Sequence, residues 1–170
     1  MIIKNRTISA DDWIVLRLHG SDITNEAVVP CGKIIVPLKV WQAQRNALQS
    51  RAELGVWLAS DERAEDLKND LAFFSVIAVD FPKFSDGRGY SIAACLRARL
   101  GYAGELRAIG DVLRDQMFYM QRVGFDAFAA RPDKDIGDAL KGLNDFTLSY
   151  QASSDDNSPL FRRVQRGGKS

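Results

Sequence analysis

Apolar runs alternate with longer segments of mixed polarity over most of the chain, most regularly after Gly55. Short apolar or β-branched runs predict strands at residues 56–59, 73–81, 105–109 and 125–128. Each is followed by a segment with apolar residues at helical spacing, at residues 60–70, 91–100, 111–123 and 135–150. This order predicts four consecutive βα units, with a parallel sheet and right-handed crossovers.

Four βα units are half of what a closed eight-stranded barrel needs, so the α/β sheet is either open or a parallel half-barrel. Residues 1–54 form an N-terminal β/α arm, with strands expected at 13–18 and 34–38, a loop at 20–26 and a helix at 40–52. Pro37 makes the second of these an edge strand or a strand end. We predict one α/β domain over residues 1–150, with the βα repeats at 55–150 and a flexible polar and basic tail at 151–170.

Two strand-to-helix turns carry polar residues, and repeating α/β folds bind ligands at such turns. The first turn consists of Ser85, Asp86, Gly87, Arg88, Gly89, Tyr90 and Ser91, and the second contains Gly110 and Asp111. Backbone N–H groups and Arg88 suit a phosphate, sulfate or carboxylate, and Ser91 suits a helix cap. The glycines fall short of a dinucleotide fingerprint. The alternative is a structural turn in which Asp86 and Arg88 pair with neighbouring loops.

Charged residues inside the predicted strands are a second sign of a polar site. They are Asp80, Arg107 and Asp126. A buried strand holds a charge where that charge is paired or opens onto a site. Asp80 and Arg107 therefore form either a structural ion pair or the floor of an anion pocket, completed by Arg88 above and Asp111 beside it.

Composition narrows the classes of partner. The formal net charge is +1 with no strongly basic block, so we expect no nucleic-acid partner. The apolar runs are too short to span a bilayer and the N-terminus lacks a signal pattern, which predicts a cytoplasmic protein without membrane association. Cys31, Cys95 and His19 show no metal-ligand spacing, so we expect no metal site. No nucleophile–base pair or phosphate-binding loop is visible, and the residues identify no cofactor.

Two long motifs carry a resemblance. The segments FPKFSDGRGYS at residues 81–91 and GELRAIGDVLRDQ at 104–116 resemble a bacterial family of unknown function. The resemblance continues through residues 122–128 and more loosely over 55–150. Members of that family are commonly encoded beside sulfite reductase and other assimilatory sulfur genes, and are often labelled probable oxidoreductases of sulfite reduction. The family has no established catalytic residues to carry over.

The resemblance implies one of two functions. The first is an accessory protein of assimilatory sulfite reduction that binds an oxyanion, a cofactor phosphate or a partner carboxylate, with sulfite reductase or a related enzyme as partner. The second is an oxidoreductase that uses a non-covalent cofactor. The residues favour the first, because no redox group or complete cofactor fingerprint is present.

The predicted sheet also has two edges, and an exposed edge strand is a template for pairing with another chain. The N-terminal arm can shield one edge. Because two-fold dimers are the commonest oligomers, we expect a homodimer. The alternative is a monomer in which the arm and the tail protect both edges.

Overall fold

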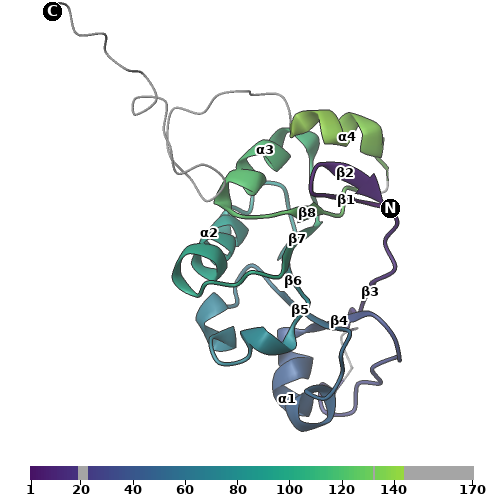
Figure 1. Ribbon diagram of the computed structural model, residues 1–170, viewed down its shortest axis with the longest axis vertical. Coiled ribbons are helices and arrows are strands. Elements are labelled where there is room, and N and C mark those ends of the chain that lie inside the picture. The colour runs from purple at the N-terminus through teal and green to yellow at the C-terminus, as the bar shows by residue number, and fades with distance from the viewer. Residues whose placement is uncertain (19–22, 132, 144–170) are drawn as a thin grey trace, which may run out of the picture.

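The computed structural model describes residues 1–18, 23–131 and 133–143, which form a curled half-barrel sheet with helices packed against it (Figure 1). The sheet order is β2-β1-β8-β7-β6-β5-β4-β3. The strands are β1 (Ile2–Lys4), β2 (Thr7–Ser9), β3 (Ile14–Val15), β4 (Ile34–Pro37), β5 (Leu54–Leu58), β6 (Val76–Phe81), β7 (Glu105–Gly110) and β8 (Ala127–Phe128). The α-helices are α1 (Leu38–Leu48), α2 (Arg88–Ala94), α3 (Arg114–Val123) and α4 (Ile136–Gly142).

Strands β3 to β8 are parallel to one another, whereas β1 is antiparallel to both β8 and β2. The predicted α/β class with a parallel half-barrel and an N-terminal β/α arm is therefore confirmed. Strand β4 lies between β5 and β3, so Pro37 marks the end of an interior strand and not an edge.

The two faces of the sheet are covered differently. Helices α1, α2 and α3 lie on the outer face, while the segment that links β2 to β3 runs along the inner face (Figure 1). Successive side chains of β6 point to opposite faces of the sheet. Ile77, Val79 and Phe81 belong to the large core under the helices, and Val76 and Ala78 belong to a smaller cluster on the inner face. The arm therefore fills part of the concave side of the half-barrel.

The segment after β5 differs from the predicted helix at residues 60–70. It forms two short 3₁₀ turns, Ala64–Leu67 and Leu71–Phe73. Side chains compete with helix formation here: Glu62 Oε2 accepts the N–H of Ala59 at 2.8 Å, and Asp70 accepts the indole N–H of Trp41 at 2.8 Å. These contacts tie the segment to β5 and α1.

The N-terminal hairpin was not predicted from the pattern. Strands β1 and β2 are joined by Asn5 and Arg6, whose φ angles of 49° and 62° lie in the left-handed region that tight two-residue hairpin turns require. The predicted strand at 13–18 is shorter, at Ile14–Val15, and residues 20–22 of the predicted loop lie outside the described residues.

The boundaries of the helices also differ from the predicted ones. Helix α2 begins at Arg88 and continues into a π-helical stretch, Cys95–Arg99, so Ser91 lies inside the helix and does not cap it. Helix α3 begins at Arg114, three residues after Asp111. Helix α4 ends at Gly142, and both the remainder of the predicted last helix and the tail at 151–170 lie outside the described residues.

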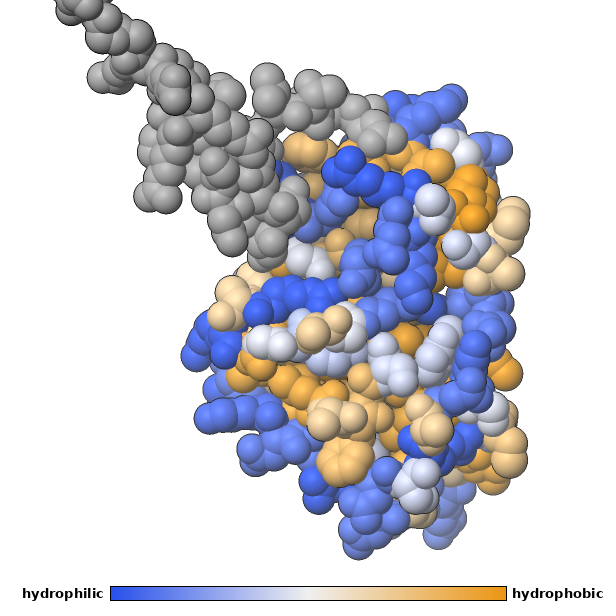
Figure 2. All heavy atoms as spheres, in the orientation of Figure 1, coloured by the Kyte–Doolittle hydropathy of each residue, from blue (hydrophilic) through white to orange (hydrophobic). Residues whose placement is uncertain are grey.

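Hydrophobic residues on the face shown in Figure 2 appear in several separate patches among hydrophilic residues. Among the described residues, no helix has the length and apolar character needed to cross a membrane.

Candidate functional site

The predicted Ser85–Ser91 turn is held by an internal polar cluster. Arg88 donates from Nε to Asp86 Oδ1 at 2.9 Å and from Nη2 to Asp86 Oδ2 at 2.7 Å. Ser60, in the loop after β5, donates to Asp86 at 2.7 Å and accepts from Arg88 Nη2 at 2.9 Å. These contacts match the structural alternative, in which Asp86 and Arg88 pair with a neighbouring loop. The Nη1 group of Arg88 has no partner among the described residues, and the side chain is 61% exposed.

The glycines of this turn have a packing role. A Cβ at Gly89 would lie 2.6 Å from Cζ of Phe81, so the start of α2 can rest on the Phe81 ring only because this position has no side chain. Tyr90 packs on the same ring at 5.4 Å between centroids and on Tyr119 at 5.1 Å. Ser85 is exposed.

We expect Asp86 to stay ionised in acid. The hydrogen bonds from Arg88 and Ser60 hold the pKa of Asp86 well below its ordinary value, so their stabilising effect is present above about pH 4 and is lost as the pH falls toward the lowered pKa. The substitution Arg88→Gln should move the titration midpoint up toward about 3.9. Carboxyl carbon chemical shifts in an NMR titration measure this. Arg131→Gln is the control and should leave Asp86 unchanged; an unchanged midpoint in Arg88→Gln would show that the ion pair is not the cause.

The predicted pairing of Asp80 with Arg107 is wrong. Both lie on the inner face, but Arg107 is opposite Ala78 in the sheet, whereas Asp80 is opposite Ile109, two residues further along the strands. Arg107 is 2% exposed and donates from Nε to Glu105 at 2.8 Å and from Nη1 to Asp11 at 2.9 Å. The positive charge of Arg107 is therefore balanced by Glu105 and by Asp11, which belongs to the β2–β3 linker on the inner face.

Asp80 pairs instead with Arg17, at 2.7 Å from Nη2 to Oδ1. The Arg17 guanidinium lies 4.7 Å over the ring of Trp57, and Trp57 donates its indole N–H to the Leu16 carbonyl at 2.9 Å. We call Arg17, Trp57 and Asp80 the inner-face site. Asp80 is at the end of β6, and Arg17 follows β3, so the site lies toward the carboxyl ends of the parallel strands. This is where α/β folds bind ligands.

Gly110 makes room for the Asp80 carboxylate. Its φ is 91°, and a Cβ there would lie 2.8 Å from Asp80 Oδ1 and 2.4 Å from the Phe81 carbonyl oxygen. Any other residue at this position would be strained and would displace the carboxylate that holds Arg17.

The remaining predicted site residues are in separate structural contacts. Asp111 accepts the N–H of Phe84 at 2.9 Å and Nη1 of Arg131 at 3.0 Å, which joins the loops after β6, β7 and β8. Asp126 accepts from Arg97 at 2.7 Å and from the N–H of Leu106 at 2.9 Å; burial raises the pKa of Asp126, and the positive charge of Arg97 opposes this. The structure therefore does not bring Arg88, Arg107 and Asp111 into one cluster.

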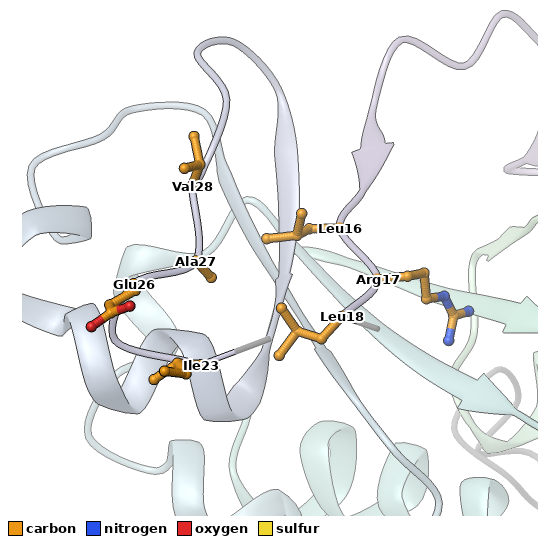
Figure 3. Close-up of a pocket in the computed structure, with 7 residues that line it drawn as sticks. All are labelled: Leu16, Arg17, Leu18, Ile23, Glu26, Ala27 and Val28. Atoms are coloured by element: carbon orange, nitrogen blue, oxygen red, sulfur yellow. The ribbon is translucent and has the colours of Figure 1, made fainter. Parts of the chain in front are cut away.

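A cavity of about 390 Å³ lies beside the inner-face site. It is lined by Leu16, Arg17, Leu18, Ile23, Glu26, Ala27 and Val28 (Figure 3). In Figure 3 the Arg17 side chain points away from Leu16 and Leu18. This follows the alternation of β3 and places the guanidinium on the inner face. Another cavity, of about 370 Å³, lies between α3 and α4, and one of about 240 Å³ lies beside Lys4 and Glu105.

The described residues contain no group of three His, Cys, Asp or Glu side chains placed to hold a metal ion. Arg17 was not singled out from the sequence. The signal was nevertheless present, because an arginine inside the run Trp13–Leu18 is as unusual in a strand as Arg107.

The chain matches a known protein family over its βα repeats. The model of a family described as bacterial proteins of unknown function (DUF934) matches residues 55–161, a range that begins within β5 and includes all of the predicted βα repeats. No curated protein and no solved structure matches the chain.

Proposed function

Because the chain belongs to this family of bacterial proteins of unknown function, we propose its function from the inner-face site and from the resemblance carried by its two motifs. We propose an accessory protein of assimilatory sulfite reduction, working in the cytoplasm, that binds a small oxyanion or a cofactor phosphate. Its partner in this proposal is sulfite reductase or a related enzyme of sulfur assimilation.

Arg17 is the observation that supports this proposal. A guanidinium has five N–H donors, and the contacts within the described residues use only one nitrogen of Arg17, the Nη2 bound to Asp80. The group is 43% exposed while its planar face rests on Trp57, which fixes its orientation. An oriented, half-exposed guanidinium with free donors suits the oxygens of sulfite, sulfate or phosphate.

Asp80 sets the strength of this binding. Its carboxylate orients Arg17 but also offsets the positive charge that attracts an anion. We therefore expect loose binding, with dissociation constants on the order of millimolar. That strength suits a protein that passes an anion to an enzyme.

Tryptophan fluorescence tests the proposal directly, because the ring of Trp57 lies under the proposed ligand-binding group. Titration with sulfite, sulfate and phosphate should change the emission of the wild-type protein, and Arg17→Gln should weaken binding at least about tenfold. Trp57→Phe should remove most of the signal. Arg88→Gln is the matched control, since its guanidinium is also exposed but lies in the other cluster.

Wild-type protein that shows no response at millimolar anion concentrations would overturn the proposal, as would equal binding by Arg17→Gln. The absorbance spectrum of the purified protein addresses the oxidoreductase alternative. A flavin or iron–sulfur band would favour that alternative over an accessory role.

A further inference from the structure

Two features on the carboxyl side of the sheet complement each other: the exposed aromatic side chain of Phe84 and the cavity between α3 and α4. Phe84 is 60% exposed, and the cavity measures about 370 Å³. We propose that Phe84 of one chain binds in the cavity of a second copy, and that the reciprocal contact forms at the same time in a two-fold homodimer.

Phe84 is held in place for such a contact. Its N–H donates to Asp111 Oδ2 at 2.9 Å, and its carbonyl accepts from Gln116 Nε2 at 2.5 Å. Both partners belong to the loop and helix that follow β7, so two neighbouring βα units fix the backbone of an exposed ring. A preorganised aromatic residue loses little conformational entropy on binding and is a typical anchor of protein interfaces.

The cavity has the size and lining that a phenyl ring needs. Its apolar floor consists of Val112, Leu113, Ala130 and Ala139. An apolar cavity of about 150 Å³ is enough to bind benzene, so 370 Å³ can hold the ring of Phe84. Phe84 is absent from the residues lining this cavity, and its backbone is fixed by Asp111 and Gln116, so the ring of the same chain does not fill it.

The charges around the two features are also complementary. Lys83, next to Phe84, is exposed, and its ammonium group has no partner among the described residues. The charged residues lining the cavity are Asp115, Asp135 and Asp138 together with Arg114 and Lys134, so acidic groups are in excess by one. The carboxylate of Asp115 is exposed and makes no hydrogen bond or ion pair with the described residues. A lysine beside the anchor and an unpaired carboxylate beside the cavity favour the same docking.

A second copy of this chain is the occupant that uses all of these features together. Anchor and cavity lie on neighbouring units of one chain, so a two-fold axis between two chains forms both contacts in one interface. Each dimer then contains two buried phenyl rings and two lysine–aspartate pairs. An interface through the exposed edge of β3 would instead use Ile14, which is 56% exposed.

Light scattering behind a sizing column, on the full chain over a hundredfold dilution range, tests the proposal. The wild-type protein should have twice the 18.9 kDa mass of the chain at the higher concentrations. Phe84→Ala should raise the dimer dissociation constant by about 100-fold or more, because each dimer loses two anchors. Ile14→Ala is the matched control of similar exposure and should leave the dimer intact.

Charge reversal at Lys83 and Asp115, which are both exposed, provides a second and independent test. Lys83→Glu should weaken the dimer, and adding Asp115→Lys should restore it, because the reversed pairs attract again. A wild-type monomer at every concentration overturns the proposal, and so does a Phe84→Ala protein that dimerises as tightly as the wild type. Loss of the dimer in Ile14→Ala alone would place the interface at the β3 edge and would also overturn it.

Discussion

Replacing Arg107 by methionine should lower the free energy of unfolding by about 3–5 kcal/mol. The side chain is 2% exposed, and its guanidinium is enclosed by Glu105, whose side chain is 6% exposed, and by Asp11. Methionine fills much of the volume but removes the ion pair with Asp11 and leaves the buried carboxylate of Glu105 with Lys4 alone. Urea unfolding followed by circular dichroism measures the loss.

Two further variants distinguish the effect of losing the buried charge from the general effect of replacing an arginine by methionine. Arg63→Met is the control, because Arg63 is 74% exposed and its contact with Glu65 is 3.9 Å long; its cost should stay below about 1 kcal/mol. Adding Glu105→Gln and Asp11→Asn to Arg107→Met should recover part of the stability. Equal costs for Arg107→Met and Arg63→Met would contradict the role of Arg107.

Replacing Arg97 by methionine should be nearly as costly, at about 3–4 kcal/mol. Arg97 donates to the carbonyl oxygens of Gly124 at 2.9 Å, Tyr102 at 2.6 Å and Gly104 at 2.8 Å, and to Asp126 at 2.7 Å. One side chain thus satisfies three backbone acceptors and a carboxylate, and joins the turns that precede β7 and β8. Thermal or urea unfolding at pH 7 gives the loss.

This second loss should depend on pH. Burial already raises the pKa of Asp126, and removal of the Arg97 charge should raise it further. A raised pKa in the folded state means that stability is greatest below the ordinary pKa and is lost as the pH rises, so Arg97→Met should be least unstable near pH 4. Arg99→Met is the control, because Arg99 is 70% exposed with one contact to Glu65. A pH-independent loss would argue against the Asp126 contribution.

The sequence predicted the sheet better than the helices because strand burial leaves a plain signature. Strands β5 to β8 are mostly apolar, since both faces are covered, and their order predicts parallel pairing. The segment after β5 also has helical spacing, but Glu62 and Asp70 bind the backbone and α1 instead. The β1–β2 turn contains no glycine, so its left-handed residues, Asn5 and Arg6, gave no signal.

The sequence predicted which strand residues of the candidate site need partners, but it did not predict the partners. Charges inside strands correctly marked Asp80 and Arg107 as residues that need partners, but the partners come from the N-terminal arm, at Arg17 and Asp11. Periodicity places a side chain on one face of a sheet and does not show which distant segment crosses that face. The turn around Arg88 was correctly identified as polar, but Gly89 is needed there to leave room for the Phe81 ring.

The strand order affects how the chain is made. Ile3 pairs with Phe128, so strand β1 cannot join β8 until more than a hundred further residues have been synthesised. Residues 1–54 supply strands to both edges of the sheet, and the β1–β2 and β3–β4 pairs lie within this arm, but β1 reaches the rest of the sheet only through β8. Such distant pairing slows folding and leaves apolar segments exposed to other nascent chains in the meantime. We therefore expect the β1–β2 hairpin to join the rest of the sheet late, after β8 has formed.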